Sequence, residues 1–231
     1  MATKDKKKGI LTIPAISLTD GKFVILGKDS NYEPIEDEDG SPVDLMAFTE
    51  ELVRRFGDAI YINDIDGMER NNPQYSVLKK LTSLAELWVD AGVRSGDALI
   101  DIIFAGAQRP VLSTKSMGDL DDIPAALEVS DGILLCIDYE KGIIARNRDL
   151  SKMTPARVAE AAKKAGVEDI IFADHGRKKK DSIKSDIISE LCAIGLGTYV
   201  GGNVGSKDLP TLEKLGVKGA LLDMGEVLKN W

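Results

Sequence analysis

Eight short, largely apolar runs of β-forming residues alternate with longer amphipathic segments along this chain of 231 residues. Parallel strands joined by helices give this alternation, because each crossover between them needs a helix-length connection. An open doubly wound sheet usually has fewer strands and an early glycine-rich nucleotide loop, and neither GxGxxG nor GxxxxGK[ST] occurs here. We therefore predict an α/β fold, a closed (β/α)8 TIM barrel, with strands at residues 10–16, 59–65, 85–91, 109–114, 132–138, 168–174, 196–202 and 218–224.

The segment at residues 154–166 is the clearest predicted helix. Thr154 is a favoured N-cap, Pro155 fits the first turn and Gly166 is a typical stop. The same features predict helices at residues 44–57, 75–83, 185–195 and 208–216. Residues 97–106 add apolar material between the third and fourth strands, and residues 20–42 are interpreted as a long polar loop. That loop would lie at the C-terminal face of the barrel, where active-site lids are found.

The two halves of the chain resemble each other. The first strand leads through Ser17 to a turn at Gly21, and the fifth strand ends at Asp138 and leads to a turn at Gly142. Glycine turns also precede helices after the third and seventh strands. The pattern predicts a twofold half-barrel repeat in which Ser17 and Asp138 face each other across the barrel. We interpret residues 1–231 as one barrel domain with a polar tail at residues 1–9.

Composition excludes several classes of partner. Acidic residues outnumber basic ones by 38 to 30, for a formal charge of −8, which argues against a nucleic-acid partner. The basic runs at residues 4–9 and 177–180 are typical of solvated segments. No apolar run is long enough to cross a bilayer and no signal peptide is recognisable. Cys136 and Cys192 lack metal-ligand spacing and fit buried free thiols. We expect a soluble cytoplasmic protein without a membrane partner, and its oligomeric state stays open.

Carboxylates gather at the predicted C-terminal strand ends, where active sites of such barrels lie. The position of Asp138 at the end of the fifth strand predicts a catalytic acid or base, assisted by Asp174 and by His175, the only histidine. Helix capping, pairing with arginines, or an acidic pocket for a cation are the alternatives. Their spacing is not a metal signature, so we predict neither a metal nor a cofactor. The full set is Asp64, Asp66, Asp90, Asp138, Asp174, His175 and Asp223.

Lys115 closes the predicted fourth strand. A lysine at this place in a barrel can form a Schiff base with a carbonyl substrate. We interpret it instead as an anion-binding or solvated side chain.

Six motifs resemble those of the histidine-biosynthesis barrels HisA and HisF. In chain order "IPAISLTDGK" is similar to the family's IPAIDLKDGK, "YINDIDGM" to VVDLDGA, "DAGVRS" to GGGIRS, "CIDYEKG" to SIDARDG, "IIFADHGRKKKDS" to IIYTDISRDGT and "GGNVGSKDL" to GGVSSLEDL. The likeness covers almost the whole chain. It implies a twofold-repeated (β/α)8 barrel that performs Amadori-type aldose–ketose isomerisation of a ribosyl-aminoimidazole carboxamide bisphosphate, or imidazole formation from its product.

The resemblance also implies an acid and a base, both aspartates, at the ends of strands one and five. Asp138 matches the second of these, but Ser17 stands at the first. A hydroxyl has no useful acid or base strength near neutral pH without a neighbouring base. Ala173 also replaces the family's sixth-strand threonine. We expect Ser17 to contact the substrate together with Asp64 and Arg94.

Two phosphate sites are implied in addition, each at glycine turns that begin helices. The third-strand turn keeps one glycine of three, and Asp223 stands where the eighth strand usually has a glycine. A carboxylate there would repel phosphate. We therefore expect at most one intact site, at the seventh-strand turn. The predicted phosphate-binding residues are Gly92, Ser113, Thr114, Gly201 and Gly202.

Three functions stay open from the sequence. The first is a diverged HisA-like enzyme, of isomerase or lyase type, acting by acid/base catalysis on a small phosphorylated sugar or carbonyl metabolite outside histidine synthesis. The second is genuine phosphoribosylformimino-5-aminoimidazole carboxamide ribotide (proFAR) isomerase activity, with Asp20 or Asp64 standing in for the missing carboxylate. The third is a non-catalytic ligand-binding barrel.

Overall fold

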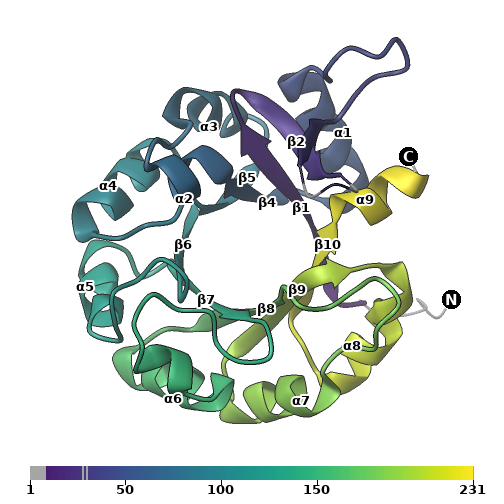
Figure 1. Ribbon diagram of the computed structural model, residues 1–231. Coiled ribbons are helices and arrows are strands. Elements are labelled where there is room, and N and C mark those ends of the chain that lie inside the picture. Colours follow the sequence, from purple (N-terminus) through teal and green to yellow (C-terminus); the bar gives the residue numbers. More distant parts are fainter. Residues whose placement is uncertain (1–8, 28, 30, 231) are drawn as a thin grey trace, which may run out of the picture.

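A computed structural model describes residues 9–27, 29 and 31–230, so most of the predicted polar tail lies outside the described residues. Within these ranges, eight parallel strands form a closed ring, because the last strand pairs back with the first. Figure 1 shows the ring viewed along the barrel axis. The predicted TIM barrel is confirmed. Its strands are β1 (Leu11–Thr19), β4 (Ala59–Asp64), β5 (Glu86–Asp90), β6 (Arg109–Ser113), β7 (Leu134–Tyr139), β8 (Asp169–Asp174), β9 (Gly197–Val204) and β10 (Gly219–Asp223).

Helices surround the ring and cover its outer face (Figure 1). The five predicted helices occur within two residues of their expected bounds. The hydroxyl of Thr154 accepts from the backbone N–H of Arg157, and Gly166 ends that helix at a φ of 110°. The helices are α1 (Leu45–Phe56), α2 (Ile65–Arg70), α3 (Tyr75–Leu81), α4 (Gly96–Phe104), α5 (Asp122–Val129), α6 (Pro155–Ala165), α7 (Ser185–Ile194), α8 (Leu209–Leu215) and α9 (Met224–Val227), with 3-10 turns at Leu150–Lys152, Ser206–Asp208 and Leu228–Asn230.

The prediction of a long polar loop at residues 20–42 was wrong. This segment contains β2 (Lys22–Leu26), which is antiparallel to β1, and β3 (Tyr32–Pro34), which is antiparallel to β2. The segment forms strands because its apolar side chains can be buried: Phe23 is buried and packs on Phe48 of α1, with ring centroids 5.9 Å apart. A hairpin therefore extends β1 beyond the ring (Figure 1).

Side chains inside the barrel form a separate small core. Trp88 and Tyr199 meet edge to face there, with ring centroids 4.9 Å apart. Successive side chains of a strand point to opposite faces, so the inward position after this core layer faces the barrel mouth. The residues that follow core positions in this way are Ser17, Asn63, Asp90, Ser113, Asp138, His175, Gly201 and Asp223.

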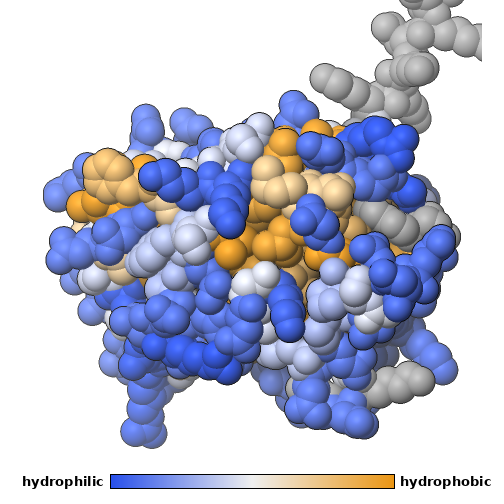
Figure 2. Space-filling view, turned by 90° about the horizontal axis from the view of Figure 1, so that it is seen from above, coloured by the Kyte–Doolittle hydropathy of each residue, from blue (hydrophilic) through white to orange (hydrophobic). Residues whose placement is uncertain are grey.

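The outer surface is mostly hydrophilic in the side view of Figure 2, with apolar residues gathered near the centre of that face. Both cysteines are free; Cys136 is buried inside the barrel and Cys192 is partly exposed. None of the helices formed by the described residues is long and apolar enough to cross a membrane.

Candidate active site

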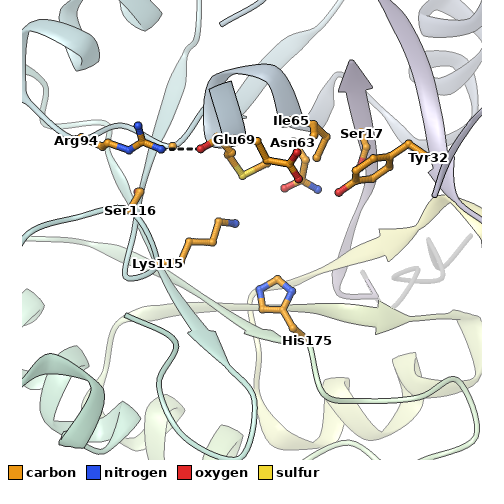
Figure 3. Close-up of a pocket in the computed structure, with 11 residues that line it drawn as sticks. Ser17, Tyr32, Asn63, Ile65, Glu69, Arg94, Lys115, Ser116 and His175 are labelled. Atoms are coloured by element: carbon orange, nitrogen blue, oxygen red, sulfur yellow. Dashed lines mark hydrogen bonds between the residues drawn. The ribbon is translucent and has the colours of Figure 1, made fainter. Parts of the chain in front are cut away.

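Two adjoining cavities open at the C-terminal ends of the barrel strands. The outer cavity, of about 410 Å³, extends to Met68, Glu69 and Arg94. The inner cavity, of about 270 Å³, reaches down to Tyr61 and Cys136. Because they share lining residues, they form one continuous site, whose outer part is shown in Figure 3. The shared residues are Ser17, Tyr32, Asn63, Lys115 and His175.

Ser17 and Asp138 lie on opposite sides of this site. Three strands separate β1 from β7 in either direction around the ring. Both residues line the inner cavity. The side chain of Asp138 is 0% exposed, so a ligand reaches its carboxylate only by entering that cavity.

Four side chains contact the carboxylate of Asp138, the weakest contact being that of the Thr114 hydroxyl, 3.4 Å from Oδ2. His175 Nε2 lies 2.6 Å and Lys115 Nζ 3.4 Å from Oδ1, while the hydroxyl of Ser113 donates to Oδ2. Burial alone raises the pKa of Asp138, but Lys115, His175 and Ser113 together outweigh it and hold the pKa at about 2. Asp138 is therefore an anion at neutral pH. It cannot deliver a proton itself, but it orients His175 and Lys115.

His175 follows β8 directly and presents its ring to both cavities. Its backbone N–H donates to the carbonyl of Tyr139, and its side chain is 44% exposed. With Nε2 on Asp138, the other ring nitrogen, Nδ1, faces the site without a hydrogen-bond partner among the described residues. An imidazole held in this way by a carboxylate can accept or donate a proton at Nδ1.

Lys115 extends from the end of β6 between two fully buried carboxylates. Its Nζ lies 3.0 Å from Asp90 Oδ2 and 3.4 Å from Asp138 Oδ1. Burial lowers the pKa of Lys115, but these two carboxylates outweigh burial and raise the pKa above its ordinary value. The side chain therefore stays protonated, which argues against the Schiff-base alternative, since that reaction needs a neutral amine.

The family model for histidine biosynthesis proteins matches residues 11–228. The chain belongs to this family. Curated relatives carry the name 1-(5-phosphoribosyl)-5-((5-phosphoribosylamino)methylideneamino)imidazole-4-carboxamide isomerase. The one from Caldanaerobacter subterraneus is 25% identical and aligns over 92% of this chain and 90% of its own length. Those from Listeria monocytogenes (26% identical; 94% and 92%) and Streptococcus thermophilus (27%; 91% and 91%) are similar. The resemblance inferred from the motifs is thereby confirmed.

Asp64 and Asp174 of this histidine-biosynthesis barrel do not line either cavity. Each follows an inward-facing strand residue and therefore points toward the helices. Asp64 caps α2 by accepting from the backbone N–H groups of Gly67 and Gln74. Asp174 Oδ2 lies 3.7 Å from Lys184, and its Oδ1 is buried without a hydrogen-bond partner among the described residues.

The predicted fourth-strand residues support Asp138 and do not face a ligand. Ser113 and Thr114 are both fully buried. The Thr114 hydroxyl accepts from the Asp138 backbone N–H at 2.9 Å, and Ser113 binds the carboxylate. Their hydroxyl groups are thus already used. Ser116, two residues after Thr114, lines the outer cavity.

Gly92 and Arg94 lie together at the outer cavity. Gly92 has a φ of 67°, and a Cβ there would come within 2.7 Å of Met68 Cα, so only glycine fits. Arg94 donates to the Met68 carbonyl at 2.7 Å, the bond drawn in Figure 3. The exposed guanidinium has further N–H groups that can bind an anion.

Gly201 and Gly202 line the inner cavity beside Asp223. The turn is fixed by Arg177, which is buried and donates to the carbonyls of Gly202 and Asn203. The first residue of the basic run at 177–180 is therefore a structural clamp. Asp223, whose charge would repel phosphate, has the ammonium of Lys179 3.2 Å from its Oδ1.

Sequence reasoning missed several lining residues, among them Asn63, Glu69 and Tyr32. Asn63 occupies an inward position of a predicted strand, which was a usable signal. Tyr32 lies in the segment interpreted as a loop, so no pattern placed it. In the described ranges, no group of three or more His, Cys, Asp or Glu residues is placed to hold a metal ion.

Proposed function

We propose that the chain is an aldose–ketose isomerase that acts on a phosphorylated aminosugar of the kind named for its relatives. The observation that carries this proposal is the 2.6 Å contact of His175 Nε2 with Asp138, which leaves Nδ1 facing the cavities. The names of the relatives favour this function over one outside histidine synthesis. These names support the proposed class of substrate, but they do not identify the catalytic residues.

His175 supports acid/base chemistry better than the stand-in carboxylates expected from the sequence. Asp64 is used as a helix cap, and the Asp20 side chain is exposed and 3.3 Å from Arg70. Neither residue lines the cavities. The imidazole, in contrast, lines both cavities and can act as an acid or a base there.

Proton transfers at Nδ1 account for the isomerisation. The imidazolium gives its proton to the sugar ring oxygen as the C1–O bond breaks and C1 forms a double bond to the substituent nitrogen, and the neutral imidazole then accepts the proton released from C2. The imidazolium formed in this way gives that proton to C1 and takes up the proton of the C2 hydroxyl, so the enol becomes a ketone and the starting state of His175 is restored. His175 thus acts alternately as acid and base, and Asp138 holds the ring through these steps.

The phosphate groups would lie at opposite ends of the joined cavities. Gly92, Arg94 and Ser116 offer donors at the outer end, where Lys115 adds a permanent positive charge. The turn at Gly201 and Gly202 offers a second place at the inner end. The ion pair of Lys179 with Asp223 reduces the repulsion that the carboxylate alone would exert there.

The test is turnover of proFAR by the purified protein, together with rescue of a bacterial strain that lacks this isomerase. We expect rescue by the wild type and none by the Asp138→Asn variant, because its neutral amide cannot orient the His175 ring as the carboxylate anion does. An exposed control, Lys178→Ala, should rescue fully. A wild type that neither rescues nor turns over proFAR, in an assay where a curated relative does, contradicts the proposal.

A second candidate is an enzyme for a different phosphorylated sugar or carbonyl compound. Ser17, in place of the family carboxylate, favours it, because substrate recognition at that wall has changed. Thermal-shift screening with phosphorylated metabolites separates the candidates: binding and turnover of another compound would identify it. Binding without turnover of any compound would instead support the non-catalytic barrel.

A further inference from the structure

The proposed isomerase has a catalytic pair on one wall of its site and no equivalent acid on the other. The Ser17 hydroxyl has no hydrogen-bonded base among the described residues to activate it. The other polar residues on this wall are Tyr32, Asn63 and Glu69. Tyr32 and Asn63 line both cavities, whereas Glu69 lines only the outer one. A substrate that spans the joined cavities therefore passes Tyr32.

The hairpin carries Tyr32 over the barrel mouth. Ser17 of β1 pairs with Val24 of β2, Val24 pairs with Pro34 of β3, and Tyr32 begins that third strand. Figure 3 shows Tyr32 beside Ser17, with its hydroxyl directed into the space that Lys115 and His175 enter from the other strands. Its exposed fraction of 39% leaves the ring accessible to a ligand.

From this placement we infer that Tyr32 is a catalytic hydrogen-bond donor to the sugar oxygen on C2, opposite His175, at the position where the family's first-strand carboxylate is missing. The inference rests on the proposed isomerase function. During the reaction this oxygen changes from a hydroxyl to a carbonyl and gains negative charge as its proton leaves. A fixed donor stabilises that charge. No proton leaves Tyr32, so the proton transfers at His175 stay as described.

The electrostatic surroundings keep the phenol protonated. Burial raises the pKa of Tyr32, and the carboxylate of Glu69 raises it further, while Lys115 acts in the opposite direction. The phenol is therefore a donor throughout the neutral range. Lys115 and Tyr32 both face the space between the walls, so the oxygen would be held by one cation and one neutral donor.

Steady-state kinetics with proFAR test the inference through the Tyr32→Phe variant, which removes only the hydroxyl. We expect kcat to fall on the order of 10²-fold with a much smaller change in KM, because the bond strengthens as charge develops. The pH dependence of kcat should keep the shape measured for the wild type. Tyr75→Phe, on the outer helix α3, is the matched control and should keep wild-type kinetics. An unchanged kcat for Tyr32→Phe overturns the inference.

Calorimetric binding of proFAR separates this inference from the proposed function. Absence of turnover by the wild type defeats the isomerase proposal but still permits binding to be measured. In that case an affinity that is two- to tenfold weaker for Tyr32→Phe supports the contact, since a neutral hydrogen bond has about that effect. Equal affinity of the two proteins, or no binding to either, overturns it.

Discussion

At the residue scale, the site depends on one buried carboxylate that two basic side chains contact. Asp138 contacts His175 at 2.6 Å and Lys115 at 3.4 Å through the same oxygen. An uncompensated buried charge is costly, so neither side chain can be removed without disturbing the carboxylate. The reacting atom of the proposed mechanism is Nδ1 of His175, and Asp138 acts through it.

Replacing His175 by Gln removes that nitrogen while keeping a side chain that can donate to Asp138. We expect kcat for proFAR to fall by about 10² to 10⁴-fold, the usual effect of losing a general acid or base. Lys178→Ala serves as the control in the same assay. A kcat within about twofold of the wild type would exclude His175 from catalysis.

The low pKa of Asp138 also predicts an acid-sensitive contribution to stability. Because the folded-state pKa of about 2 lies below the ordinary 3.8, the contribution is complete above the ordinary value and is lost as the pH falls toward 2. It amounts to about 2 kcal/mol. In urea unfolding of the wild type and Asp138→Asn, the wild type should lose most of this amount relative to the variant between pH 5 and pH 2.5. A difference that does not change with pH contradicts the assignment.

At the element scale, the irregular stretch near the end of β9 shows how backbone geometry shapes the inner cavity. Gly202 has a φ of 90°, and a Cβ there would lie 2.3 Å from the Asp174 carbonyl oxygen. The Arg177 guanidinium fixes the same stretch through the Gly202 and Asn203 carbonyls. A change in the backbone here would therefore disturb the contacts of β9 with Asp174 of β8 and with Arg177.

The Gly202→Ala substitution should lower the unfolding free energy by roughly 1 to 3 kcal/mol, because it adds strain and a steric clash. Gly142→Ala is the matched control: no heavy atom lies within 4 Å of its added Cβ and its φ is not in the left-handed region. The control should stay within about 0.5 kcal/mol of the wild type. Chemical denaturation of all three proteins measures both values, and equal losses in the two variants would refute the strain.

The helices and strands themselves were predictable to different degrees. Regular α/β repeats can be predicted from periodicity and capping residues, as Thr154 and Gly166 show for α6. The β2–β3 hairpin was missed because the polar residues at 28–42 outweighed the short apolar run of Phe23, Val24, Ile25 and Leu26. The burial of Phe23 becomes apparent only once α1 provides a partner surface. Tyr32 was missed for the same reason.

At the scale of the whole molecule, the barrel interior connects strands that are far apart in the sequence. Trp88 of β5 packs against Tyr199 of β9, and the guanidinium of Arg109 lies 5.0 Å from the Trp88 ring. This layer lies beneath the polar residues of the mouth. A loss of packing there should therefore weaken the ring as a whole.

The Trp88→Ala substitution should cost about 3 to 5 kcal/mol, the range for removing a buried aromatic side chain. Phe104→Ala, at a side chain that is 82% exposed, should change stability by less than about 0.5 kcal/mol. Urea unfolding followed by far-ultraviolet circular dichroism gives both numbers. Equal and small effects would mean that the barrel interior contributes little to stability.

The sequence alone determined the barrel and the family, because the periodicity of strands and helices and the strand-end motifs are local properties of the chain. It also indicated Asp138 and His175, which lie at strand ends. Only the tertiary structure decided which carboxylates face the cavities, since a shift of one residue along a strand reverses the direction of a side chain. Pairing of neighbouring strands brought Lys115 between Asp90 and Asp138, and the hairpin set Tyr32 beside Ser17. Such contacts between distant segments leave no periodic trace in the sequence.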